Sequence, residues 1–256
     1  MPYGICLPNR EKVANDPSSI TAVIRLVYGK SADLLPWLDR RQLQQNYTVN
    51  YARGKTGLVF WAVSHCKTES LREKYVAELK RYIHVDIRGN CVRNHIKDKN
   101  DGFRIHKFYL AFENSICPDY ITEKTWLALS GGIVPIVLGG ADYKTFLPHH
   151  SYIDIKDFSS PKALATYLNK LDRNDTLYNE YFAWRRNYTC RNGIPRRESQ
   201  FCELCRFINK NMNKTNTIAD INKVWSPENC IPTENYYRDI ATVSYNDVFL
   251  NTTEIR

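Results

Sequence analysis

The chain has 256 residues, of which 43% are hydrophobic and 25% are charged, a composition that excludes a disordered protein. Eleven glycines and eleven prolines are too few for a collagen-like or low-complexity chain. The formal net charge of +9 favours an anionic partner. Because basic and acidic residues are interleaved along the whole sequence, this charge does not indicate a nucleic-acid-binding surface.

Strands are predicted from short apolar runs that are rich in β-branched and aromatic residues. The longer runs are almost continuously apolar, as in strands buried on both faces of a sheet. The predicted strands cover residues 20–28, 58–63, 84–88, 107–112, 133–138 and 152–155.

Helices are predicted where apolar residues recur every three or four positions. The predicted helices cover residues 71–83, 122–130, 161–171 and 175–184. Strands that alternate with helices predict a parallel sheet covered on both faces, which is a Rossmann-like α/β fold. We expect this domain over residues 58–208, preceded by an N-terminal segment and first strand region at 1–57 and followed by a polar tail at 209–256.

The sequence contains no predicted membrane-spanning or targeting segment. The longest apolar stretch, residues 131–141, is too short to cross a bilayer and contains Pro135. The N-terminal residues do not follow the basic, apolar and small-residue order of a signal peptide.

Eight cysteines are more than a cytosolic domain of this size usually carries, and their even number allows all of them to pair in an oxidising compartment. Five Asn-x-Ser/Thr sequons give mild support for secretion. The alternative is a zinc site built from Cys202 and Cys205 together with Cys190 and Cys230. The sequence leaves both interpretations open.

Two common nucleotide-binding motifs are excluded. Residues 54–56 (GKT) lack the earlier glycine of a P-loop and precede a strand instead of following one. The chain has no Asp-x-Asp pair to hold a divalent ion against a diphosphate. The nearest acidic spacings lie in polar stretches, where we expect the carboxylates to be solvated: Asp98 to Asp101 and Asp154 to Asp157. A bound diphosphate would therefore be neutralised by side-chain cations and backbone N–H groups.

The clearest functional signal follows the apolar run that ends at residue 112. Glu113 and Asn114 come directly after it, and ligands of open α/β sheets bind at this C-terminal edge. Thr122 is a suitable helix N-cap, which places Glu123 and Lys124 in the first helical turn. A lysine there opposes the helix dipole unless it serves an anion such as a diphosphate. The alternative is a favourable first-turn acid at Glu123 and a solvated surface lysine at Lys124.

The segment 108–140 contains FYLAFENS, DYITEK and GGIVPIVLGG, and it closely resembles the signature of the α1,3-fucosyltransferases, a eukaryotic family that uses GDP-fucose. A looser resemblance extends from residue 58 to about 209 and includes WAVSHC, FAWRR and FCELC. Three cysteines make the chain more similar to the invertebrate members than to the vertebrate ones: Cys66, Cys91 and Cys117.

The resemblance implies the donor domain of a two-domain, twin-Rossmann glycosyltransferase of the GT-B type, inverting and independent of metal ions. It implies that Arg72 and Lys124 hold the diphosphate, where fixed cations would stabilise the departing GDP. Asn114 and Tyr120 would hydrogen-bond phosphate and sugar. Glu123 would contact the donor hydroxyls and stabilise charge on the fucose ring in the transition state. The alternatives are a helix-surface arginine at position 72 and a packing aromatic residue at position 120.

Members of this family are Golgi membrane proteins with a transmembrane helix and an acceptor-side domain, and neither is expected in this chain. The family's general base belongs to the acceptor domain, so no residue here is assigned that role. In relatives, cysteines such as Cys202 and Cys205 tie the C-terminus to the acceptor domain. Cys66 and Cys91 each end a strand of the same predicted sheet, and we expect them to form a local disulfide.

The activity that the resemblance implies is transfer of fucose from GDP-fucose, in α1,3 linkage, to N-acetylglucosamine of glycoprotein glycans in the Golgi lumen. No cofactor or metal is expected, and both core and antenna N-acetylglucosamine are open as acceptors. Two other hypotheses are a truncated, inactive GDP-fucose- or GDP-binding fragment without the acceptor domain, and a secreted disulfide-rich interaction domain. GDP binding would distinguish the interaction domain from the other two hypotheses. Fucose transfer would then distinguish the active transferase from the inactive fragment.

Overall fold

The computed structural model describes residues 4–8, 49–92, 98–192, 205, 207–213, 217, 219–220 and 226–240. The predicted strand at residues 20–28 lies outside this part of the chain, and so does Cys202.

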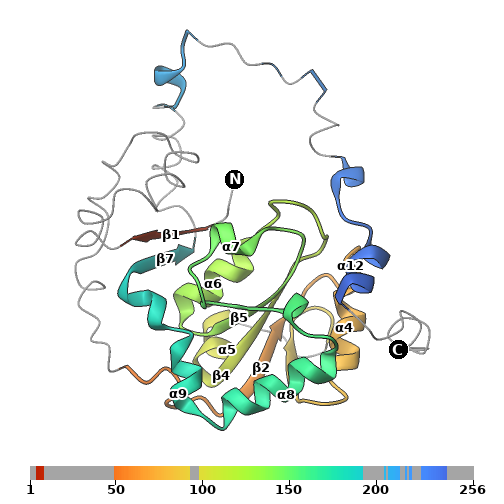
Figure 1. The fold of residues 1–256 in the computed structure, drawn as a ribbon, viewed down its shortest axis with the longest axis vertical. Coiled ribbons are helices and arrows are strands. Elements are labelled where there is room, and N and C mark those ends of the chain that lie inside the picture. Colours follow the sequence, from red (N-terminus) through yellow and green to blue (C-terminus); the bar gives the residue numbers. More distant parts are fainter. Residues whose placement is uncertain are drawn as a thin grey trace.

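The central sheet is built from β2 (Gly57–Ala62), β3 (Val85–Arg88), β4 (His106–Phe112), β5 (Val134–Leu138) and β6 (Ile153–Asp154). All neighbouring strands are parallel, in the order β3–β2–β4–β5–β6 (Figure 1). Every residue of β4 and β5 is buried, which is the physical reason for their apolar sequences. The predicted Rossmann-like α/β fold is confirmed.

Helices that follow the strands cover the sheet (Figure 1). Four of them lie where the sequence predicts helices: α4 (Arg72–Leu79), α6 (Glu123–Gly131), α8 (Pro161–Asp172) and α9 (Asp175–Glu180). The last prediction was too long, because the chain turns after α9 and enters the short 3₁₀ helix η3 (Ala183–Arg186). Within the described ranges, no helix is both long enough and apolar enough to cross a membrane.

Two short helices were not predicted, α5 (Lys99–Ile105) and α7 (Tyr143–Phe146). The sequence of α5 is mostly polar and contains Gly102, so it shows no helical apolar period. Gly102 is needed for packing, because a Cβ atom there would lie 2.3 Å from the ring of Phe60. Close tertiary packing therefore outweighs the poor helix propensity of this segment.

The side chains of β4 alternate between two apolar layers. Phe108, Leu110 and Phe112 pack in the layer that contains residues of α4, α8 and α9. Tyr109 and Ala111 pack in the opposite layer, with residues of α5, α6 and α7. A second, antiparallel sheet pairs β1 (Gly4–Pro8) with β7 (Tyr188–Asn192), and β7 contacts α6. The parallel sheet is therefore covered on both faces, as predicted.

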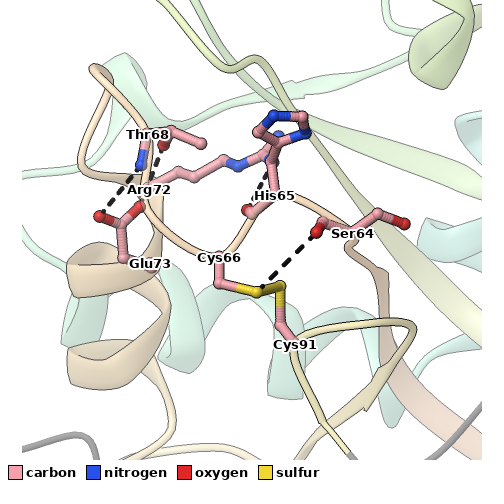
Figure 2. The surroundings of a disulfide bond; sticks show 7 residues. All are labelled: Ser64, His65, Cys66, Thr68, Arg72, Glu73 and Cys91. Atoms are coloured by element: carbon pink, nitrogen blue, oxygen red, sulfur yellow. Dashed lines mark hydrogen bonds between the residues drawn. A yellow bond between two sulfur atoms is a disulfide. The ribbon is translucent and has the colours of Figure 1, made fainter.

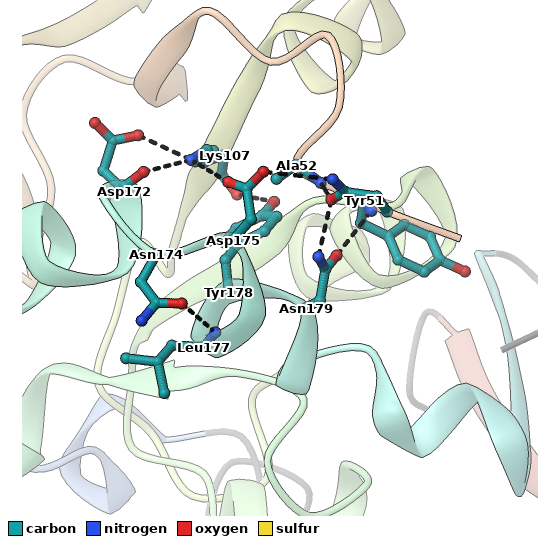
Figure 3. Close-up of polar contacts among 10 residues, drawn as sticks. Tyr51, Ala52, Lys107, Asp172, Asn174, Asp175, Leu177, Tyr178 and Asn179 are labelled. Carbon is teal, nitrogen blue, oxygen red and sulfur yellow. Dashed lines mark hydrogen bonds and ion pairs between the residues drawn. The ribbon is translucent and has the colours of Figure 1, made fainter. Parts of the chain in front are cut away.

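A buried lysine holds the N-terminal edge of the sheet together (Figure 3). The Lys107 Nζ donates to the carbonyl oxygen of Asp172 at 2.7 Å and lies 3.3 Å from an oxygen of Asp175. The hydroxyl of Tyr178 donates to the Lys107 carbonyl at 2.7 Å. Beside this cluster, the backbone N–H of Tyr51 donates to the Asn179 side chain at 2.8 Å. These bonds tie β4, α8, α9 and residues 49–52 into one unit.

The disulfides decide between the two interpretations of the cysteines. Cys66 and Cys91 form the predicted local disulfide, which joins the loops after β2 and β3 (Figure 2). Cys230 pairs with Cys117, and Cys190 is also disulfide-bonded. The zinc alternative is therefore wrong, since two of its four ligands are oxidised. Of the CxxC pair Cys202 and Cys205, the structure describes Cys205, which has a free and exposed thiol instead of the expected disulfide.

Residues 226–240 pack on the domain, although the sequence predicts a polar tail there. They form η4 (Pro227–Asn229) and α12 (Thr233–Ile240). Tyr236 and Tyr237 of α12 are buried in the main apolar layer. The sequence pattern missed this segment because two adjacent aromatic residues, and not an apolar helical period, supply the buried anchors in residues 233–238.

We expect Gly89→Ala to destabilise the fold more than Gly54→Ala. Both glycines have a positive φ, +122° and +81°, that alanine adopts only with strain. A Cβ at position 89 would lie 2.1 Å from the Val63 carbonyl oxygen, whereas a Cβ at position 54 meets nothing within 4 Å. Denaturant unfolding should show losses of about 1 kcal/mol for Gly54→Ala and about 3 kcal/mol for Gly89→Ala. Equal losses would contradict the clash.

Candidate functional site

The C-terminal edge of the sheet gathers the polar residues that the sequence singled out. The loop after β2 leads into α4 and carries Arg72, while the loop after β4 carries Asn114 and leads to Lys124 in α6. Two hydrogen bonds join these loops: the Ser70 N–H donates to the Asn114 carbonyl at 2.9 Å, and the Ser70 hydroxyl donates to the Glu113 carbonyl at 2.7 Å. The loops therefore form one rigid platform at the edge where open α/β sheets bind ligands.

A fully buried carboxylate, that of Glu113, lies at the centre of this platform. It accepts hydrogen bonds from the Thr122 N–H and the Thr122 hydroxyl, both at 2.8 Å, and it pairs with the Lys124 ammonium at 2.9 Å. Sequence analysis placed Glu113 at the strand end but gave it no role. The available signal was an acid directly after an apolar strand, since buried charges need partners.

Lys124 is not the solvated surface residue of the alternative interpretation, because its side chain is only 15% exposed. Its Nζ atom donates to the Glu113 carboxylate and, at 2.7 Å, to the Thr122 hydroxyl. These bonds use two of the three ammonium protons. Within the part of the chain that the structure describes, the third proton has no acceptor and is available to a ligand.

Thr122 occupies the N-cap position of α6, as predicted, but its side chain makes no cap hydrogen bond. Its hydroxyl instead bonds Glu113 and Lys124. The first-turn N–H groups of α6 are thus left without a side-chain cap, and they add to the positive end of the helix dipole.

Arg72 is only 3% exposed, so the alternative of a surface arginine is wrong. Its guanidinium donates to the carbonyl of Phe112 at 2.5 Å and to that of His65 at 3.2 Å, beside the Cys66–Cys91 disulfide (Figure 2). Its Nε–H has no hydrogen-bond partner among the described residues. Desolvation lowers the Arg72 pKa, and the nearby charge of Glu113 opposes that shift.

The backbone directly before Arg72 is strained at Leu71. Leu71, the N-cap residue of α4, has a φ of 50°, a left-handed conformation that non-glycine residues rarely adopt. It lies between the buried residues Ser70 and Arg72, whose hydrogen bonds to backbone carbonyls at the end of β4, those of residues 112 and 113, hold it in place. Such strain is common at functional sites.

The other expected donor residues lie on the same platform. Asn114, Tyr120 and Glu123 are half-buried. Tyr120 lies in the loop after β4, two residues before Thr122, the N-cap residue of α6. Glu123 is in the first turn of α6, beside Lys124. The structure thus brings together all five residues that the resemblance proposed.

The platform suits an anion with more than one negative charge. It offers two cations, the buried Arg72 and the half-buried Lys124, whose charges are partly offset by Glu113 and, for Arg72, also by Glu73. Both helices that begin there, α4 and α6, lack a side-chain cap at the N-terminus. Backbone N–H groups, helix dipoles and fixed cations are together the features of a phosphate site.

The acidic side chains of the described residues are too dispersed to form a metal site. Within the described residues, no three His, Cys, Asp or Glu side chains come close enough to hold a metal ion. Asp98 and Asp101 are exposed, as expected. The expectation that Asp154 is solvated was wrong. Its side chain is half-buried, and desolvation raises its pKa to about 6.

Comparisons with known proteins agree with this fold and site. A profile of "Glycosyltransferase family 10 (fucosyltransferase) C-term" matches residues 52–225. Glycoprotein 3-alpha-L-fucosyltransferase A of Drosophila melanogaster is 39% identical over 204 residues, which are 74% of this chain and 39% of that protein. Alpha-(1,3)-fucosyltransferase C of the same species is 40% identical over 181 residues, 67% of this chain and 41% of that protein.

A human relative, 4-galactosyl-N-acetylglucosaminide 3-alpha-L-fucosyltransferase 9, is 36% identical over 73% of this chain and 53% of its own length. The chain therefore spans roughly half or less of the relatives that it matches. A crystal structure of an α1,3-fucosyltransferase with GDP-fucose shares the fold, with a TM-score of 0.50 and 22% identity over 66% of this chain and 50% of that one. Because the family profile runs through all five strands of the central sheet and the whole platform, the chain belongs to glycosyltransferase family 10, the fucosyltransferases.

Proposed function

We propose that the protein transfers fucose from GDP-fucose, in α1,3 linkage, to N-acetylglucosamine of glycoprotein glycans, and that the described domain binds the donor. Family membership and the names of the relatives support the reaction. The observation that carries the donor role is the pair of cations, the buried Arg72 and the half-buried Lys124, beside two uncapped helix N-termini.

Each platform residue then has a role in an inverting transfer. The leaving diphosphate gains negative charge as the bond to fucose breaks, and Arg72 and Lys124 stabilise that charge where it develops. Asn114 and Tyr120 hydrogen-bond the phosphate and sugar. Glu123 contacts the donor hydroxyls and stabilises positive charge on the fucose ring. No residue of this chain is assigned as the general base.

The same cations make a divalent metal unnecessary for donor binding. The reaction takes place in the Golgi lumen, where the acceptor glycoproteins pass. Support comes from the disulfides Cys66–Cys91 and Cys117–Cys230, which fit an oxidising compartment.

Calorimetric titration of the chain with GDP and GDP-fucose, with and without EDTA, tests this proposal. We expect both nucleotides to bind and chelation to leave both affinities unchanged, because side-chain cations supply the counter-charge. A chain that binds neither nucleotide contradicts the proposed function. Affinity that disappears with EDTA contradicts only the metal independence. Mass spectrometry of an N-acetylglucosamine-terminated glycan incubated with GDP-fucose then tests the transfer itself.

Lys124→Ala is expected to weaken GDP binding by about 1.5–3 kcal/mol, roughly a 10- to 150-fold higher Kd, because it removes a charge-assisted hydrogen bond to the diphosphate. The substitution also leaves the buried Glu113 carboxylate without its partner. The double variant Lys124→Ala/Glu113→Gln removes that complication and should bind GDP equally weakly. Lys144→Ala, which removes an exposed lysine of α7, is the matched control and should keep wild-type affinity. A double variant that regains wild-type affinity would rule out direct binding by Lys124.

Glu123→Gln is expected to weaken binding of GDP-fucose more than binding of GDP. The proposed partner of Glu123 is the sugar, which GDP lacks. Titrations of the same preparation with both nucleotides give the two ratios to wild type. Equal losses for GDP and GDP-fucose would contradict the assignment to the sugar.

A further inference from the structure

We infer that residues 226–240, which we call the C-terminal strap, are a positioning element of the donor site: they hold the two loops that form its platform and the loop after β5, which packs against Glu113. This inference rests on the proposed function, since it names the site that the strap positions. In Figure 1 the strap ends in α12, which lies beside α4. Tyr237 of α12 stacks on Tyr75 of α4, with ring centroids 6.2 Å apart.

The first clamp is on the loop after β4, which carries Asn114 and Tyr120. The disulfide between Cys117 and Cys230 attaches the strap covalently to the middle of this loop. The next N–H of the strap, that of Ile231, donates to the carbonyl of Ile116 at 2.7 Å. The loop is thus held at two adjacent positions.

The second clamp is on the loop that leads into α4 and Arg72. The hydroxyl of Tyr237 donates to the carbonyl of Ser70 at 2.9 Å, and the hydroxyl of Thr233 donates to the carbonyl of Glu69 at 2.6 Å. Ser70 in turn donates to the carbonyl of Glu113. Through Ser70, two successive hydrogen bonds therefore connect the strap to Glu113, the residue that binds Lys124.

The third clamp is on the loop after β5. The N–H of Gly139 donates to the hydroxyl oxygen of Tyr236 at 3.2 Å. Gly139 packs directly against Glu113, because a Cβ atom on this glycine would lie 3.4 Å from the Glu113 Cγ. The strap therefore contacts the loops after β2, β4 and β5.

The strap reaches the loops through the Cys117 side chain and through backbone atoms of residues 69, 70, 116 and 139. It consequently acts through Ser70, Cys117 and Gly139, and its role is positioning. Its apolar anchors are few, since Tyr236 and Tyr237 are its buried hydrophobic residues in the described part. The disulfide spans 113 residues and offsets the entropy lost when so distant a segment is held in place.

The test compares two tyrosines with the same chemistry at opposite edges of the sheet. Tyr237→Phe removes the hydroxyl that donates to Ser70, and the ring is kept. Tyr178→Phe removes an equivalent buried bond, from its hydroxyl to the Lys107 carbonyl at the N-terminal edge. We expect similar decreases in melting temperature for the two variants. The Kd for GDP should rise about 3- to 10-fold in Tyr237→Phe and stay within about twofold of wild type in Tyr178→Phe.

The variant Cys117→Ala/Cys230→Ala provides a second measurement. Without the disulfide, the strap should dissociate part of the time, and GDP affinity should fall further than in Tyr237→Phe. If wild type binds GDP and all three variants bind it equally well, the strap inference is wrong while the proposed function stands. If affinity falls equally in Tyr178→Phe and Tyr237→Phe, general destabilisation explains the loss and the inference is again wrong. If wild type binds no GDP, both proposals fail.

Discussion

The buried charge of Glu113 is the constraint on which the rest of the site depends. A carboxylate without solvent contact is unfavourable unless cations and hydrogen-bond donors surround it. At the start of α6, Lys124 pairs with the Glu113 carboxylate and Thr122 donates hydrogen bonds to it. At the start of α4, the positive charge of Arg72 also interacts with this carboxylate. The Glu113 side chain therefore fixes the start of α6 and the position of Lys124, whereas hydrogen bonds to the carbonyls of Phe112 and His65 hold Arg72.

The same constraint explains the residues packed around it. Gly139 has no side chain because a Cβ atom would lie 2.4 Å from the Tyr143 hydroxyl and close to Glu113. Ser70 is buried because its N–H and hydroxyl bind the backbone of residues 113 and 114. The Lys107 cluster at the other edge shows the contrasting case, in which Asp172 and Asp175 supply acceptors for all the donors of a buried lysine. Lys124 differs because, among the described residues, only two acceptors take its protons, those of Glu113 and Thr122.

Much of the fold could be predicted from the sequence because the strands β2, β4 and β5 are buried on both faces and read as apolar runs. The position of the site followed from Glu113 and Asn114 at a strand end. The role of Glu113 could not be predicted, since it depends on contacts across nine and eleven residues of sequence. The pairing of Cys117 with Cys230 was missed for the same reason, because local patterns carry no information on partners 113 residues apart.

The uncapped start of α6 has a thermodynamic consequence. Thr122 uses its hydroxyl on Glu113, so the helix lacks the oxygen that would normally accept a hydrogen bond from its first turn. The diphosphate that we propose to bind there would take the place of the missing cap. Its binding would stabilise the first turn of α6 and slow amide hydrogen exchange in that turn, and fraying of the turn would in the same way weaken binding of the anion.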